Sequence, residues 1–338
     1  MYSTLEIQSK ISNYSIHFIE TLSSIQALID QPNTITFIDS NVSRLYPKLY
    51  RDANIIVECT ENVKTLEGAH KIFDDLIERK ANVQTRLVVI GGGILQDLIG
   101  FCASTYCRGI QYELVPTTLL SQADSCLGGK TSINTKGKKN ILGTFYPPSN
   151  IYICTEFLKT LEALDYCSGL GEVYKFHILE NKVDHFNIDG DIADMVYRGL
   201  LFKGDILSRD EFDKGERKYL NFGHTFGHAL ETTSKNILPH GIAVILGCMI
   251  ATRIASKLKY KVPNYNQLLE KGIELIHRAN IKLEQSWFDL ESLLEIVKSD
   301  KKSTGKLTMA LSTDHNLLQD VEDIEIVKQA LQETYESI

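Results

Sequence analysis

The feature that most constrains the fold is an alternation of short apolar runs with amphipathic segments over the first 155 residues. Five runs have the length and the β-branched, apolar character of strands: TITFIDSN, NIIVEC, RLVVIGGG, YELVPTT and NIYICT. Between the second and third runs, the segment 61–80 has helical period. One helical face is predicted to hold Leu66, Ala69, Ile72, Phe73, Leu76 and Ile77. This order favours right-handed βαβ units and a doubly wound, largely parallel sheet.

The pattern changes after residue 155, where strand-like runs nearly vanish. Helical period is found instead at 243–258, 265–279, 290–300 and 324–335. A chain of 338 residues is long for a single core, so two domains are expected. We predict an α/β Rossmann-like domain over 1–155 and a mainly α-helical, metal- and substrate-binding domain over 156–338.

Composition excludes several classes of partner. The net charge of −7 argues against broad affinity for nucleic acid. The sequence has no run of eighteen apolar residues, which predicts that nothing spans a membrane, and the N-terminus lacks a signal-peptide profile. The seven cysteines are scattered without CxxC spacing, as expected for reduced thiols in a cytoplasmic protein.

A glycine-rich turn follows the third predicted strand. Gly91, Gly92 and Gly93 stand between that strand and a predicted helix, an arrangement that lets backbone N–H groups approach a phosphate. Because this is not a GxGxxG motif, a simple tight turn is an equally good interpretation. Asp97 in the following helix, and Asp39 after the first strand, favour a nucleotide site.

A basic loop is predicted over residues 124–148. It carries Lys130, Lys136, Lys138 and Lys139 among glycines. Such a loop can bind phosphate through its charges and its backbone N–H groups. The alternative is a solvated basic turn, but apolar sequence on both sides of the loop favours a functional role.

Three of the nine histidines lie within seventeen residues. His224 and His228 are four apart and would share one face of a helix, and His240 stands at a predicted helix start. Zinc sites commonly combine three protein ligands with an open position. Glu172, with Lys175 one turn later, offers a carboxylate; this pair could be an ordinary surface pair, but its apolar surroundings favour burial.

These stretches together resemble the sugar phosphate cyclase family, most closely its 3-dehydroquinate synthases. The matching motifs, between about residues 35 and 310, are GGGILQDLIGF, TYCRG, VPTTLLSQADSCLGGKTSIN, GKKN, SGLGEVYK, GERKYLNFGHTFGHALE and PHG. The resemblance implies a phosphate-eliminating lyase of the shikimate pathway for aromatic amino acids. It would convert 3-deoxy-D-arabino-heptulosonate 7-phosphate to 3-dehydroquinate and phosphate, with catalytic NAD and Zn²⁺ or Co²⁺.

The resemblance also implies roles for individual residues. The metal ligands would be Glu172, His224 and His240, with His228 facing the substrate. The NAD site would comprise Asp39, Glu61, Lys64, Gly92, Gly93, Asp97, Thr117, Thr118, Lys139 and Thr160. Catalytic and substrate-binding roles would fall to Asp124, Lys130, Lys175, His228, Arg108, Lys139, Asn140, Lys203, Arg217, Asn221, Lys301 and Lys302. In a homodimer, Arg108 would reach the phosphate bound by the neighbouring subunit.

The sequence departs from the family pattern at three places. Ile242 stands where a glutamate usually follows the HG of the third ligand, which removes an expected partner of the metal site. The segment between Lys175 and Lys203 is short, and His177 lies near the predicted metal helix, where a plain structural histidine is the favoured interpretation.

Three other functions stay open at this point. One is a different cyclase, such as an aminodehydroquinate, deoxy-inosose or valiolone synthase; Arg217 and Lys203 favour a sugar acid instead. A metal-dependent alcohol or glycerol dehydrogenase shares the glycine turn but needs no phosphate loop. An inactive binding paralogue is disfavoured by the full set of ionisable residues.

Overall fold

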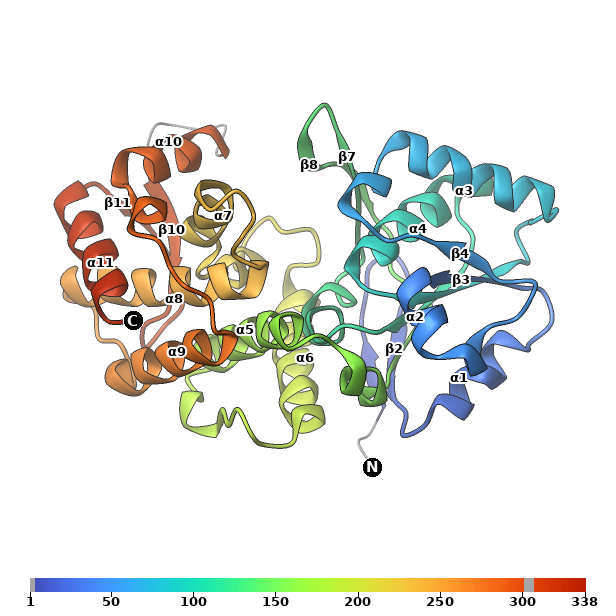
Figure 1. Ribbon diagram of the computed structural model, residues 1–338, viewed down its shortest axis with the longest axis horizontal. Helices are drawn as coiled ribbons and strands as arrows, with labels where there is room; N and C mark the ends of the chain where they lie inside the picture. The colour runs from blue at the N-terminus through green and yellow to red at the C-terminus, as the bar shows by residue number, and fades with distance from the viewer. Residues whose placement is uncertain (1–3, 301–306) are drawn as a thin grey trace. The chain divides into compact units, whose positions relative to one another are not determined.

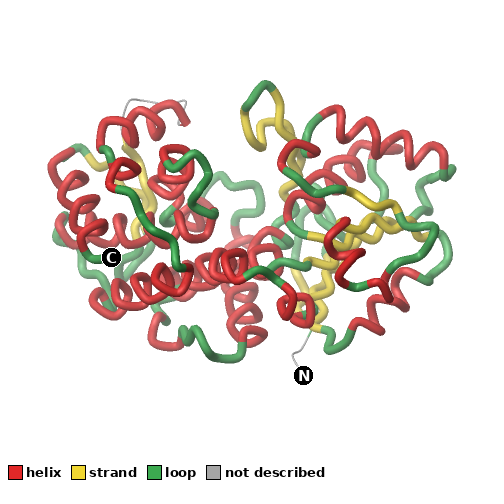
Figure 2. The backbone as a smooth tube through the Cα atoms, in the orientation of Figure 1, coloured by secondary structure: helices red, strands yellow, loops and turns green. Residues whose placement is uncertain are grey.

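The computed structural model describes residues 4–300 and 307–338. The chain divides into two compact units, Met1–Leu161 and Glu162–Ile338 (Figures 1 and 2). Strands are concentrated in the first unit and helices in the second. The predicted fold class, an α/β domain followed by a mainly helical domain, is therefore confirmed.

Unit 1 is built on a seven-stranded sheet in the order β1-β2-β9-β6-β5-β3-β4. The strands are β1 (Leu5–Ile7), β2 (Tyr14–Phe18), β3 (Thr34–Asp39), β4 (Ile55–Val57), β5 (Arg86–Gly91), β6 (Tyr112–Pro116) and β9 (Asn150–Ile153). All neighbours pair in parallel except β1 with β2. The five predicted strands are β3, β4, β5, β6 and β9; the antiparallel edge formed by β1 and β2 was not predicted.

The chain reverses its direction of progress across the sheet between β3 and β5. From β3 it proceeds outward to β4, and then returns to β5 on the other side of β3. Ile38 pairs with Ile90, so Asp39 at the end of β3 lies beside Gly91 at the end of β5. In open α/β sheets, ligands bind at the carboxyl ends of strands at such a reversal.

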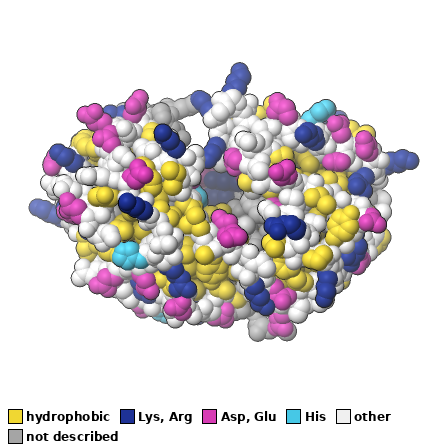
Figure 3. Space-filling model, in the orientation of Figure 1, with side chains coloured by type: hydrophobic (Ala, Val, Ile, Leu, Met, Phe, Trp, Pro, Cys, Tyr) yellow, Lys and Arg dark blue, Asp and Glu magenta, His cyan; other side chains and the backbone are white. Residues whose placement is uncertain are grey.

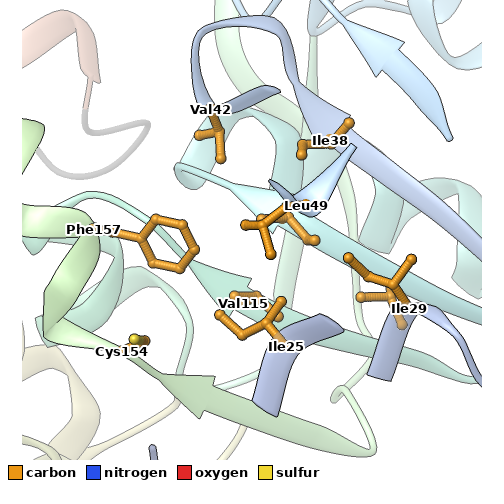
Figure 4. Close-up of a cluster of buried hydrophobic side chains, with 10 residues drawn as sticks. Ile25, Ile29, Ile38, Val42, Leu49, Val115, Cys154 and Phe157 are labelled. Carbon is orange, nitrogen blue, oxygen red and sulfur yellow. The ribbon is translucent and has the colours of Figure 1, made fainter. Parts of the chain in front are cut away.

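Helices cover both faces of this sheet (Figure 1). They are α1 (Leu22–Ile29), α2 (Ser40–Leu45), α3 (Leu66–Glu78) and α4 (Gly93–Thr105), with short 3₁₀ turns at Pro47–Leu49, Glu61–Val63, Tyr106–Arg108 and Thr155–Thr160. Figure 4 shows the core on the α1–α2 side, which contains Ile25, Ile38, Val42, Val115 and Phe157.

The buried face of α3 is narrower than its predicted apolar face. Ala69, Ile72 and Leu76 are buried, but Leu66 and Ile77 are 50% and 62% exposed. Both of the latter lie at the margins of the apolar stripe. The burial of α3 is therefore centred on Ala69, Ile72 and Leu76, and the helix packs against α4.

The predicted basic loop is an antiparallel hairpin rather than a loop. It consists of β7 (Lys130–Thr135) and β8 (Lys138–Phe145), and it is preceded by a π-helical turn at Ser121–Ser125. An irregularity in the pairing falls between Ile133 and Thr135. The hairpin forms its own two-stranded sheet beside α4 (Figure 1).

Unit 2 contains α5 (Ala163–Leu179), α6 (Ile192–Arg209), α7 (His224–Thr233), α8 (His240–Lys257), α9 (Tyr265–Ala279), α10 (Leu290–Asp300) and α11 (Ile324–Glu336). Short 3₁₀ turns lie at Val183–His185, Glu216–Asn221 and Gln285–Phe288, and one hairpin joins β10 (Leu307–Leu311) to β11 (Leu317–Val321). The four predicted helices correspond to α8, α9, α10 and α11.

Helix α8 is the central element of unit 2. Its length and apolar composition would allow it to cross a membrane, but 78% of its sequence is buried within the protein. A buried core helix passes the same test, so this is weak evidence for a membrane span.

On the face shown in Figure 3, acidic and basic side chains are interspersed.

Candidate metal and nucleotide sites

A buried ion pair lies at the centre of unit 2. Glu172 and Lys175 are one turn apart on α5, and their side chains are 0% and 2% exposed. Lys175 Nζ is 2.5 Å from Glu172 Oε2. A buried carboxylate of this kind requires compensating charge. The predicted burial of the pair is confirmed.

Two histidines approach the other oxygen of Glu172. His224 Nε2 is 3.5 Å from Oε1, and His240 Nε2 is 3.2 Å from it. Each histidine is the first residue of its helix, α7 or α8. The exposed His228 lies one turn after His224, and the ligating atoms of the three histidines lie within 4.8 Å of one another.

Close packing of α5 against α8 brings these groups together. A β-carbon at Gly171 would lie 2.3 Å from the carbonyl oxygen of Gly241, and one at Gly241 would lie 1.7 Å from that of Ser168. Both distances are impossible for a side chain, so glycine is required at both positions. Glu172 directly follows Gly171, and His240 directly precedes Gly241. The close approach of the two glycines therefore determines the distance between Glu172 and His240.

The outer nitrogens of the two histidines have different partners. His224 Nδ1 is 3.1 Å from the backbone carbonyl oxygen of Phe222. His240 Nδ1 is 3.3 Å from Glu231 Oε2, a carboxylate that the sequence analysis did not identify. The signal available in the sequence was only that Glu231 follows His228 by nearly one turn of the same helix.

Burial and neighbouring charges shift the pKa values of the residues in this cluster. Burial raises the pKa of Glu172, but Lys175, His224 and His240 outweigh burial and hold that pKa well below its usual value. Burial also lowers the pKa of His240, yet its hydrogen bonds to Glu172 and Glu231 raise the pKa to about 10. For His224, burial and the nearby Lys175 lower the pKa to about 3.

The donor set matches a divalent metal. Glu172 is fully buried, and its two oxygens are contacted by Lys175, His224 and His240. The Nε2 atoms of His224 and His240 each lie within 3.5 Å of Glu172 Oε1. A carboxylate with two histidines is a common ligand set for catalytic zinc.

Two basic side chains of unit 2 are also buried. Lys203 on α6 and Arg217, in the 3₁₀ turn before α7, are 6% and 4% exposed. The Arg217 guanidinium donates to the backbone carbonyl of Glu211, and its backbone N–H donates to Asp210 Oδ2 at 3.0 Å. Asn221, at the end of the same turn, is exposed.

In unit 1, the predicted nucleotide residues gather at the reversal point of the sheet. The Asp39 carboxylate accepts a hydrogen bond from the Asn41 backbone N–H at 2.7 Å at the start of α2. Gly92 precedes α4, and a β-carbon there would lie 3.2 Å from Thr118 Cγ2. Thr117 donates its N–H to the carbonyl oxygen of Gly91 at 3.2 Å. The reversal point thus brings together Asp39, the glycine turn and both threonines.

Lys64 links the glycine turn to the β7–β8 hairpin. Its buried Nζ donates to Asp97 Oδ2 and, at 2.6 Å, to Asn140 Oδ1. Burial raises the pKa of Asp97, and Lys64 partly offsets that effect. Ser132, which was not predicted, donates to the same Asp97 oxygen at 3.0 Å.

Asn134 lies in the predicted basic loop, but the sequence analysis gave it no role in a site. Its side chain donates to Glu61 Oε1 at 2.7 Å and accepts the Asn140 backbone N–H at 2.8 Å. It lies at the pairing irregularity of the hairpin. Polar residues that bond only to other candidate residues leave no periodic signal in a sequence.

The remaining predicted residues are more dispersed. Asp124 lies in the π-helical turn, Lys130 begins β7, and Lys139 is exposed on β8. The Thr160 hydroxyl is 2.8 Å from that of Tyr46. Arg108 is exposed and has left-handed backbone geometry, with φ of 65°. Lys301 and Lys302 lie outside the described residues.

Comparison with known proteins identifies relatives of both units. The family model described as 3-dehydroquinate synthase N-terminal matches residues 54–168, and the corresponding C-terminal model matches residues 168–303. The 3-dehydroquinate synthase of Dictyoglomus turgidum is 40% identical over 286 residues, covering 80% of this chain and 79% of its own. That of Streptococcus pyogenes serotype M6 is 31% identical, covering 96% of this chain and all of its own.

Solved structures share the fold. A 2-deoxy-scyllo-inosose synthase, solved with carbaglucose-6-phosphate, NAD⁺ and Co²⁺, superposes with a TM-score of 0.81 at 24% identity, covering 98% of this chain and 99% of its own. The 2-epi-5-epi-valiolone synthase of Streptomyces hygroscopicus, with NAD⁺ and Zn²⁺ bound, has a TM-score of 0.83 at 21% identity, covering 99% of each chain. The sequence matches over both units show that the chain belongs to the 3-dehydroquinate synthase family.

Proposed function

We propose that this protein is a 3-dehydroquinate synthase, which eliminates phosphate from a seven-carbon sugar acid phosphate and closes the carbocycle. The observation on which the proposal rests is the buried Glu172 carboxylate, approached by His224 and His240 and paired with Lys175, in a member of this family. Bound NAD would take up and return a hydride, and a bound divalent metal would lower the pKa of a substrate hydroxyl.

Glu172, His224 and His240 would hold the metal, Zn²⁺ or Co²⁺. Sharing of one carboxylate oxygen between two imidazole Nε2 atoms supports this set. His228 is close enough to be a fourth ligand, but its exposure suits contact with substrate better. Lys175 would keep Glu172 ionised, because its ammonium group balances the buried charge.

Unit 1 would bind NAD at the reversal point of the sheet. Asp39 is suited to the ribose hydroxyls, and the Gly92–Gly93 backbone at the start of α4 to the pyrophosphate. Lys64, Asp97 and the two threonines, with Glu61 and Thr160, would complete the site. Lys130, Lys139 and Asn140 would bind the phosphate, with Asp124 nearby in the chain.

We further propose a cytoplasmic homodimer in which Arg108 contacts the partner's substrate phosphate. Its exposed position in a left-handed turn supports the proposal, because non-glycine residues adopt such backbone angles at an energetic cost. All seven cysteines lie in the described part of the chain and are free thiols, as in a reducing compartment.

Arg217 and Lys203 would bind the substrate carboxylate. We expect Arg217→Lys to lower kcat/KM for the sugar acid by about 2 kcal/mol, ~30-fold, because lysine cannot make a two-pronged contact. The matched control is Arg209→Lys, since Arg209 is half-exposed on α6. Equal losses for the acid and for a sugar phosphate without a carboxylate would rule out this role, and would favour another type of cyclase.

The decisive test of the reaction class is stoichiometry. Given the heptulosonate phosphate, catalytic NAD and Zn²⁺ or Co²⁺, the protein should release phosphate over many turnovers without accumulating NADH. NADH should not accumulate because the hydride removed in the oxidation step is returned to the substrate after phosphate is eliminated, before the cofactor leaves the protein. The rival is a dehydrogenase, because a probable glycerol dehydrogenase shares the fold at a TM-score of 0.60. Steady NADH formation matching substrate loss, without phosphate, would establish the rival.

A further inference from the structure

The Glu231 carboxylate lies directly behind His240. Glu231 Oε2 is 3.3 Å from His240 Nδ1, and its side chain is 18% exposed. Its backbone carbonyl accepts hydrogen bonds from the Asn236 N–H at 2.7 Å and from the Ser234 hydroxyl at 3.0 Å. The main chain at Glu231 is thus held in place at the last turn of α7.

This contact decides which nitrogen of His240 is available to a ligand. An anionic oxygen beside Nδ1 holds a proton on Nδ1, so the proton that a metal would displace from the ring is the one on Nε2. Nε2 is the atom that lies 3.2 Å from Glu172. The carboxylate therefore directs the coordinating face of the ring toward the other candidate ligands.

The other histidine of the set is oriented differently. His224 Nδ1 faces a neutral backbone carbonyl, that of Phe222. A carboxylate strengthens the basicity of the ring more than a neutral acceptor does. Ile242, which stands where the sequence analysis expected a carboxylate, is fully buried among the apolar residues of α8 and contributes no charge.

We infer that Glu231 is a positioning residue that sets the tautomer, orientation and basicity of His240 for metal binding. The inference rests on the proposed metal site. Helix α7 then provides Glu231 from its last turn in addition to His224 and His228. The Glu231 carboxylate takes the place of the one that is absent at Ile242.

The test compares Co²⁺ and Zn²⁺ binding by metal-free protein carrying Glu231→Gln or Glu231→Ala. We expect Glu231→Ala to raise the dissociation constant about 10–100-fold and to alter the visible absorption bands of bound Co²⁺. Glu231→Gln should lose less affinity, because an amide oxygen still accepts from Nδ1–H but has no charge. Glu270→Gln, at an exposed position on α9, is the matched control and should bind like the wild type.

Three results would overturn the inference in distinguishable ways. Wild-type affinity and an unchanged Co²⁺ spectrum in both Glu231 variants would show that Glu231 positions nothing. Equal losses in the glutamine and alanine variants, with a lower unfolding midpoint in both, would show a structural role only. Failure of the wild-type protein itself to bind either metal would refute the proposed site and the inference together.

Discussion

Replacing His224 with alanine should abolish turnover and stoichiometric metal binding while leaving both units folded. The substitution removes one of three converging donors and leaves a carboxylate with a single imidazole. Since a metal contributes several kcal/mol to such a transition state, we expect activity to fall by a factor on the order of 10³ or more. His224 lies at the first position of α7, so the rest of the helix retains its packing.

Metal content after dialysis, measured together with phosphate release, checks this expectation. His277→Ala is the matched control, because His277 is exposed near the end of α9, where its Nε2 is 3.1 Å from the carbonyl oxygen of Ile338. That variant should keep both metal and activity. Stoichiometric zinc retained by the His224 variant would contradict the ligand assignment and would leave His228 as the alternative donor.

Replacing Lys175 with methionine should destabilise unit 2 of the metal-free protein by about 3 kcal/mol, because it leaves the Glu172 charge buried without its nearest cation. The wild-type pKa of Glu172 is depressed in the folded state. The pair therefore stabilises the fold above the unfolded pKa, near 4.5, and this stabilisation is lost as the pH falls through the folded pKa. The difference between variant and wild type should be full at neutral pH and shrink in acid.

The protein has one tryptophan, Trp287, and it is buried in unit 2, so its fluorescence during denaturant unfolding reports on this unit. Lys182→Met is the control, since Lys182 forms a partly exposed pair with Glu180 and should change stability by at most about 0.5 kcal/mol. Adding Glu172→Gln to Lys175→Met should recover much of the loss. A Lys175 variant as stable as the wild type at neutral pH would show that the histidines alone balance Glu172.

Elements with a clear hydrophobic period were predictable, and those without one were not. The five parallel strands and helices α8 to α11 follow from apolar runs and helical spacing. Hairpin β7–β8 did not, because β8 is exposed along most of its length and is rich in lysine, asparagine and glycine. Such a strand has no alternation of buried and exposed residues.

The candidate site shows the same division. Helical spacing placed His224 beside His228 and His240 at a helix start, since both depend on local structure. The contacts of Glu231 with His240, and of Asn134 with Glu61, depend on how separate elements meet. The spacing of residues in the sequence does not show which elements contact one another, so these contacts were found only in the structure.

The close approach of α5 and α8 bears on how this centre could be redesigned. Gly171 and Gly241 let the two main chains touch, so the distance between Glu172 and His240 is a property of the backbone rather than of side-chain length. The ligand side chains are therefore the adjustable part of the scaffold, and the two glycines are its fixed part. A library that varies Glu172, His224 and His240 would test new metals while the packing of α5 against α8 stays unchanged. A library that varies the two glycines would disrupt this packing, and with it the site, before any new chemistry could be selected.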